Sequence, residues 1–105
     1  MDQETILETV KKYIAFVESQ QYDIRKVYLF GSFAKGEANE NSDIDLAIVM
    51  KEMDNSVFTQ FQLMKMRRDF DLRIEPHPFS EIDFIPSNPF VDEIIHTGIP
   101  IFLEK

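Results

Sequence analysis

With 105 residues and 44% hydrophobic content, the chain is long enough for one domain with a single core, and we expect residues 1–105 to form that domain. The formal net charge of -8 argues against an extended nucleic-acid groove, because phosphate backbones are bound by clustered Lys and Arg. Cysteine is absent, which excludes disulfides and thiol catalysis. The sequence shows no signal peptide, and no apolar run approaches the roughly 20 residues of a membrane span, so we expect a cytoplasmic protein.

The first predicted elements are a helix and a strand. From Glu4 to Ser19 apolar residues recur at intervals of three and four, which is the pattern of an amphipathic helix. Residues 26–30, KVYLF, form a short β-branched and aromatic run that stops at Gly31, as a buried strand does. Residues 43–50, DIDLAIVM, predict a second buried strand, and the polar segment between the two strands leaves room for one helical turn.

A second helix is predicted after this strand and is expected to end near Phe70. Three consecutive polar residues can cap its N-terminus: Asp54, Asn55 and Ser56. Its buried face is expected to consist of Val57, Phe61, Met64 and the stem of Arg68.

A third strand is predicted in the segment DLRIEPHPF. Pro76 and Pro78 lack the N–H groups that a central strand needs, so Glu75 is predicted to be the last residue of this strand.

The C-terminal part is predicted to hold a short helix and an edge strand. Residues 89–96 fit a helix with Phe90, Ile94 and Ile95 turned inward, and Gly98 fits its C-cap. The segment IPIFLE that follows is expected to be an edge strand. The predicted fold class is therefore α/β, a small mixed sheet flanked by helices.

Two aspartates open the second strand. Side chains two residues apart on a strand point to the same face, so Asp43 and Asp45 are expected to project together. Adjacent carboxylates repel unless a cation lies between them, and Mg²⁺ is usually held by one or two carboxylates plus substrate phosphates. Glu75 is the later acid whose strand can lie beside this one, although Glu81 and Asp83 are close alternatives. Three acids at neighbouring strand ends would form a two-metal site.

The turn before these acids has the composition of a phosphate-binding loop. Gly31 allows the backbone to pass close to a phosphate and to adopt a positive φ. Ser32 supplies a hydroxyl and a backbone N–H, a short helix from Ser32 to Lys35 would direct its first N–H groups at an anion, and Lys35 adds a positive charge. Turn and acids together predict one site, in which the turn holds a triphosphate and the acids hold the metals.

Each of these features has a simpler interpretation when taken alone. An Asp-x-Asp pair is more often a helix cap or a solvated strand start, Gly31 and Gly36 could belong to an ordinary turn, and Lys35 could be a solvated surface residue. The combination favours the site. His77 and His96 are interpreted as structural or solvated histidines and are not assigned to catalysis. Local ion pairs and solvated faces account for Arg67, Arg68 and Arg73.

The segment LFGSFAKGEANENSDIDLAIV resembles the nucleotidyltransferase signature of the polymerase β-like superfamily, in particular the minimal nucleotidyltransferases. The resemblance implies a single-domain nucleotidyltransferase fold and the transfer of a nucleoside monophosphate from ATP or another nucleoside triphosphate, with two Mg²⁺ ions. By position, it makes Gly31 and Ser32 the phosphate turn and Asp43 and Asp45 metal ligands. It makes Glu75 the third acid, a metal ligand that also accepts the proton of the attacking hydroxyl.

Two positions depart from the pattern of the family. The third acid is commonly Asp, whereas Glu75 is one methylene longer. Many relatives have arginine in the turn after Gly-Ser, where this chain has Phe33 and Lys35, and lysine is a point charge without the bidentate fork of arginine.

The resemblance also implies a partner. Minimal members are often encoded beside a small helical protein of the HEPN type, and the chain would then be the antitoxin that nucleotidylates this toxin on a tyrosine hydroxyl. An interaction protein of the same fold that inhibits its partner by binding is an alternative, as is a subunit of a small-molecule, antibiotic-type nucleotidyltransferase. Because so small a chain shows no acceptor-binding domain, a homodimer is a further possibility for presenting the acceptor. Extended nucleic-acid binding and membrane association are not expected.

Overall fold

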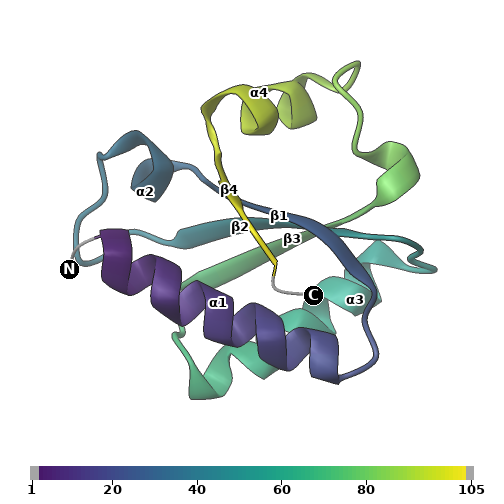
Figure 1. The fold of residues 1–105 in the computed structure, drawn as a ribbon, viewed down its shortest axis with the longest axis horizontal. Helices are drawn as coiled ribbons and strands as arrows, with labels where there is room; N and C mark the ends of the chain where they lie inside the picture. Colours follow the sequence, from purple (N-terminus) through teal and green to yellow (C-terminus); the bar gives the residue numbers. More distant parts are fainter. Residues whose placement is uncertain (1–2, 104–105) are drawn as a thin grey trace.

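The computed structural model describes residues 3–103 and contains a four-stranded mixed sheet in the order β3-β2-β1-β4 (Figure 1). The two central strands, β1 (Ile24–Phe30) and β2 (Ile44–Met50), run antiparallel to each other. The two edge strands are β3 (Ile74–Ser80), parallel to β2, and β4 (Ile99–Ile101), antiparallel to β1. The predicted α/β fold is confirmed, including the edge position of β4 and the helical turn α2 (Ser32–Lys35) between β1 and β2.

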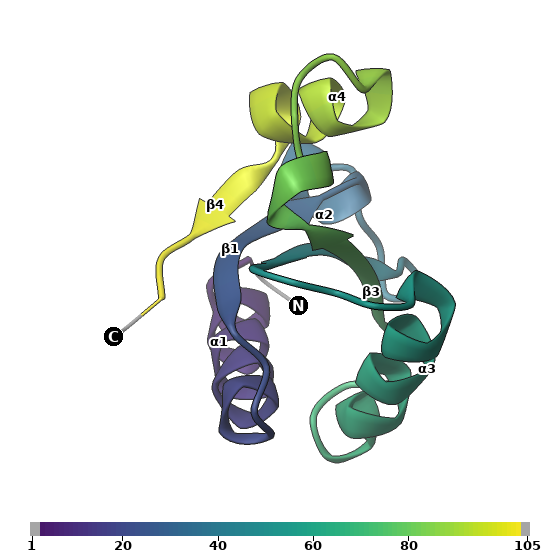
Figure 2. The same cartoon turned by 90° about the vertical axis from the view of Figure 1, so that its right-hand side faces the viewer.

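One face of the sheet packs against α1 (Gln3–Ser19) and α3 (Ser56–Met66), which lie on the same side of it in both views (Figures 1 and 2). The apolar stripe predicted for the first helix is buried here. The buried residues of this core include Val10, Ile14, Val17, Leu29, Ile44, Leu46, Ile48 and Leu63. The Tyr13 hydroxyl donates a hydrogen bond of 2.7 Å to the Leu63 carbonyl oxygen, which joins the two helices inside the core.

The other face of the sheet is covered by α4 (Pro89–Thr97) and is rich in aromatic rings. Because side chains alternate along a strand, Asp45, Ala47 and Val49 of β2 project to this side. Val91 and Ile94 of α4 pack onto Ala47 and Val49 in a second, smaller core. Partly buried rings complete it: Tyr28, Phe30 and Phe79.

Within the described residues, no helix has the length and apolar character needed to cross a membrane.

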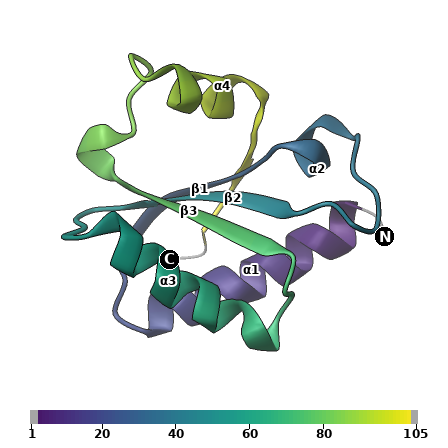
Figure 3. The ribbon, with the colours of Figure 1, turned by 180° about the vertical axis from the view of Figure 1, so that it is seen from behind.

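The prediction that Glu75 ends its strand was wrong. β3 continues through Pro76 and Pro78 to Ser80, so Glu75 lies at the second position of the strand. The prolines are tolerated because β3 is an edge strand, with a hydrogen-bonded neighbour on one side only. On the open side, the side chains of Arg67 and Gln60 donate hydrogen bonds of 2.7 and 3.1 Å to the carbonyl oxygens of Ile74 and Pro76. Figure 3 shows α3 lying along β3, which brings these side chains within reach.

The predicted inward faces of α3 and α4 were wrong in part. Asn55 caps α3 as predicted and accepts a hydrogen bond from the Phe58 N–H. However, Thr59 and Leu63 are the residues that α3 buries, while Val57 and Phe61 are 76% and 60% exposed. In α4 the buried pair is Val91 and Ile94, while Phe90 is 44% exposed. Each helix carries two apolar stripes, so spacing alone did not tell which one meets the sheet.

Candidate active site

The predicted acids meet where β2 and β3 begin and β1 ends. Asp45 pairs in register with Phe30, the last residue of β1, and with Glu75 of β3. Since β2 and β3 are parallel, the side chains of Asp45 and Glu75 leave the sheet on the same face, the one opposite α1 and α3. Asp43 lies one residue before β2 and forms a side-chain hydrogen bond with Glu75. The structure therefore brings together the three predicted acids, Asp43, Asp45 and Glu75.

The electrostatics of this cluster favour a bound cation. Partial burial raises the pKa of Glu75, and the hydrogen bond with Asp43 and the negative charges of Asp43 and Asp45 raise it further. A raised pKa shows that the ionised carboxylate is disfavoured in the absence of a positive charge. Carboxylate oxygens are ligands that Mg²⁺ takes in proteins, so the chemistry of this donor set fits a divalent ion of that kind.

The glycine turn lies directly against the acids. Gly31 has φ +73° and ψ -149°, and a Cβ built on it would lie 2.5 Å from Oδ2 of Asp45. Only glycine leaves room for the Asp45 carboxylate in its present position. Ser32, the next residue, is the first of α2, for which Gly31 is the N-cap. The turn and the Asp45 carboxylate are thus neighbours in the structure, as the predicted site requires.

Lys35, which was predicted to bind phosphate, forms an ion pair with a residue of α4. Its ammonium lies 3.7 Å from Oε1 of Glu93 on α4, so within the part of the chain that the structure describes its ion pair is with this glutamate. The pair spans α2 and α4 and is largely exposed, so it can open at little cost when a phosphate competes for the ammonium.

His77 also lies beside these acids, although sequence reasoning gave it no role there. Its Nε2 lies 3.3 Å from Oδ1 of Asp45, and its ring packs beside the rings of Phe30 and Phe90, with centroid distances of 5.1 and 6.4 Å. Asp45, Glu75 and His77 each offer one ligand atom, and these three atoms lie within 4.8 Å of one another. Alternate residues of a strand share a face, so a predicted strand that continued through the prolines would have placed His77 on the same face as Glu75.

The alternative acids and His96 lie elsewhere, whereas Arg73 directly precedes β3 at the same end of the sheet as the acids. Glu81 and Asp83 follow Ser80, which pairs with Met50 at the opposite end of β2 from Asp45, so neither can replace Glu75. His96 contacts the Asp92 carbonyl oxygen one turn earlier in α4, as expected of a helix-end histidine. Arg73 forms a bidentate pair with Asp71.

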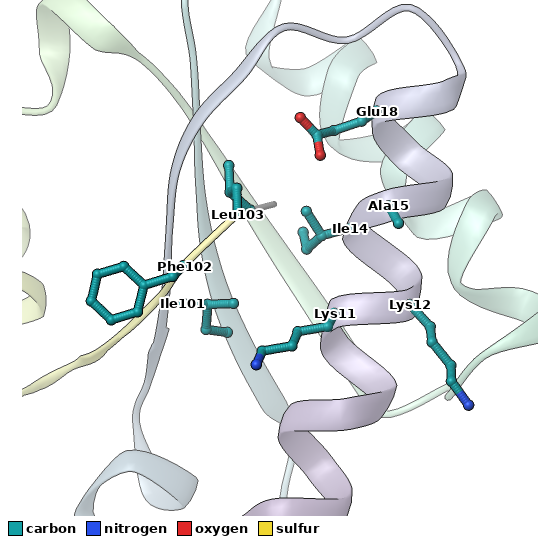
Figure 4. Close-up of a pocket in the computed structure, with 8 residues that line it drawn as sticks. All are labelled: Lys11, Lys12, Ile14, Ala15, Glu18, Ile101, Phe102 and Leu103. Atoms are coloured by element: carbon teal, nitrogen blue, oxygen red, sulfur yellow. The ribbon is translucent and has the colours of Figure 1, made fainter. Parts of the chain in front are cut away.

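A separate hollow lies between α1 and β4 (Figure 4). Its lining contains none of the predicted site residues and includes Lys11, Lys12, Ile14, Ala15, Ile101 and Phe102. The view shows Ile14 and Ile101 pointing into the gap and Lys11 extending toward Ile101, whereas Phe102 and Lys12 point away from it.

Comparisons with known proteins agree with this geometry. The family model described as "Polymerase beta, Nucleotidyltransferase" matches residues 8–105. The protein MJ0141 of Methanocaldococcus jannaschii, named as a candidate protein adenylyltransferase, is 29% identical over 99 residues, covering 91% of this chain and 95% of its own. A crystal structure of a candidate nucleotidyltransferase from Sulfolobus solfataricus superposes with a TM-score of 0.64 at 25% identity, covering 97% of this chain and 84% of the other.

A second similar structure, of a toxin–antitoxin with AMP-PNP, shares the fold with a TM-score of 0.61 at 17% identity, over 100% of this chain and 76% of that one. The match of the family model over nearly the whole chain decides the classification, because it includes both the glycine turn and the three acids. The protein is a nucleotidyltransferase and belongs to the polymerase β family.

Proposed function

We propose that this protein transfers AMP from ATP to a hydroxyl group of a partner protein, using Mg²⁺ ions held by Asp43, Asp45 and Glu75. The observation that carries the proposal is the register of β2 and β3, which places Glu75 beside Asp45, with Gly31 in contact with the Asp45 carboxylate. A triphosphate bound by the turn would therefore lie next to the metal-binding acids.

The reaction is an in-line substitution at the α-phosphorus. The acceptor oxygen forms a bond to phosphorus, the bond from phosphorus to the bridging oxygen breaks, and pyrophosphate leaves. Divalent ions held by these acids would lower the pKa of the attacking hydroxyl and offset the negative charge of the departing pyrophosphate. The chain contributes positioning: Gly31 and Ser32 hold the phosphates, Asp43 and Asp45 hold metal, and Glu75 holds metal and receives the proton of the acceptor hydroxyl.

Two similarities support ATP and a protein acceptor. MJ0141, which matches nearly the whole chain, carries the name of a protein adenylyltransferase. The toxin–antitoxin structure of the same fold was solved with AMP-PNP, an ATP analogue. On these grounds we assign the adenine nucleotide as donor and a protein hydroxyl as acceptor.

The same similarity suggests the partner. We infer that the partner is a toxin, as in that structure. From the resemblance of the sequence to the minimal nucleotidyltransferases, we further infer that this toxin is a small helical protein of the HEPN type that is modified on tyrosine, with this chain as its antitoxin. The chain has an exposed surface for such contact on α3, where Val57, Phe58 and Phe61 leave large apolar areas uncovered.

The test is transfer of AMP by the purified protein. Incubation with ATP and Mg²⁺ in a lysate of the source cell is followed by intact-mass analysis for proteins that gain one AMP group. We expect labelling by the wild type, none with Asp45→Asn or Glu75→Gln, and full labelling with Asp54→Asn, an exposed aspartate in the loop before α3. Labelling that survives Asp45→Asn would contradict the proposal.

A second function is favoured by the apolar surface of α3. Inhibition of the partner by binding alone needs this surface and no chemistry. Absence of labelling by the folded wild type, together with capture of the partner by both the wild type and Asp45→Asn, would establish this alternative.

A further inference from the structure

The histidine beside the acids has the placement of a ligand. His77 and Glu75 alternate on β3, so their side chains leave the strand on the same face, and both point toward Asp45 of the neighbouring strand. This is a nitrogen donor added to a carboxylate site, and it comes from the same edge strand that supplies the third acid.

The distances suit coordination of one ion. Two ligands about 2.1 Å from a metal and at right angles to each other lie about 3.0 Å apart. The separation of His77 Nε2 and Asp45 Oδ1 is 3.3 Å, and Glu75 completes a set whose ligand atoms lie within 4.8 Å of one another. Small rotations of the carboxylates would bring all three to bonding distance.

The imidazole ring is also held in place. Phe30 of β1 and Phe90 of α4 pack beside it, with ring centroids 5.1 and 6.4 Å away, and the two phenylalanine rings also contact each other. His77 is about one-quarter exposed, as is Asp45, so solvent and a hydrated ion can reach both. A ligand whose orientation is set by packing loses less entropy when it binds metal.

We propose that His77 is a metal ligand, which with Asp45 and Glu75 binds one divalent ion and gives the site a preference for Mn²⁺-class transition metals over Mg²⁺. Imidazole nitrogen suits transition metals, whereas Mg²⁺ prefers oxygen. The proposal rests on the proposed function in that it names the metal of the same site, but it concerns binding alone.

The first test uses the wild-type protein, labelled with ¹⁵N in histidine and free of nucleotide. The chain has only two histidines, so the NMR spectrum of the imidazoles is simple, and His96→Ala assigns it. During titration with Zn²⁺ we expect Nε2 of His77 to move to the position of a metal-bound nitrogen while His96, which is exposed on α4, stays unchanged. Saturation of the site without a change at Nε2 would show that His77 only donates a hydrogen bond to Asp45, and would overturn the proposal.

The second test measures selectivity by calorimetry with Mn²⁺ and with Mg²⁺. We expect His77→Ala to weaken Mn²⁺ binding by about tenfold or more and to change Mg²⁺ binding much less, with His96→Ala as the matched control. Equal losses for both ions would contradict the proposed selectivity. Neither test involves ATP or an acceptor, so a failure here leaves AMP transfer standing, and a protein without transferase activity can still bind metal through His77.

Discussion

Replacement of Gly31 by alanine tests whether the glycine turn and the acids form one site. The backbone of Gly31, at φ +73° and ψ -149°, is in a region that essentially only glycine adopts. Holding alanine there costs about 1–3 kcal/mol of the free energy of unfolding. The added Cβ would lie 2.5 Å from Oδ2 of Asp45, and the end of this side chain can rotate away. The domain should therefore still fold, with the carboxylate displaced.

Gly36→Ala is the matched control. Gly36 is also left-handed, at φ +72° and ψ 19°, but a Cβ there meets nothing within 4 Å. Its cost should be about 1–2 kcal/mol, from backbone strain alone. The two variants are thus expected to lose similar stability and to differ in function.

The assay combines urea unfolding with calorimetric titration of Mg²⁺ and Mn²⁺. We expect Gly31→Ala to lose metal affinity by about tenfold or more, since a metal ligand is displaced, and Gly36→Ala to bind as the wild type does. Retention of wild-type affinity by folded Gly31→Ala would refute the reasoning that the turn lies against a metal ligand.

Three further substitutions test the electrostatics and the packing. Without metal, Glu75→Gln should raise the free energy of unfolding near pH 7. The pKa of Glu75 is raised in the folded state, so the stability of the wild type falls as pH rises through that pKa. The stability that Glu75→Gln gains over the wild type should therefore vanish below the ordinary pKa of Glu, which urea unfolding across pH will show. With saturating Mg²⁺ the variant should instead be less stable than the wild type. Gly98→Ala should lower stability by about 1–3 kcal/mol in thermal unfolding, because its Cβ would lie 2.5 Å from the Ile94 carbonyl oxygen, a backbone atom that cannot rotate away; an unchanged melting temperature would contradict this contact. Tyr13→Phe should cost about 1–3 kcal/mol in urea unfolding, since it leaves the buried Leu63 carbonyl oxygen without this donor, and a neutral result would mean that water replaces the hydroxyl.

Much of the fold could be predicted from local pattern. The helix α1 has a single apolar stripe, and the strands β1 and β2 are short apolar runs bounded by Gly31 and by the acids, so each had one reasonable interpretation. The pairing of turn and acids followed from their spacing. Asp43 and Asp45 came from the same spacing, whereas Glu75 was one of three candidate acids and only the register of β3 places it beside Asp45.

The errors share a physical cause: they depend on which neighbours an element has. Pro76 is incompatible with a central strand and acceptable in an edge strand, and nothing in the residues themselves says that β3 lies at the edge. Because the predicted strand ended at Glu75, the prediction did not place His77 near Asp45. In α3, Leu63 and Phe61 lie in competing apolar stripes, and only the position of the sheet decides between them.

The open side of β3 limits how this protein can associate. Pro76 and Pro78 have no N–H to offer, and the carbonyl oxygens of Ile74 and Pro76 already accept hydrogen bonds from Arg67 and Gln60. A strand from another chain would find few free backbone groups there, and the opposite edge, β4, has three residues, one of them proline. The sheet is therefore protected at both ends against edge-to-edge aggregation, and any assembly is expected to use side-chain surfaces of the helices instead of an extended sheet.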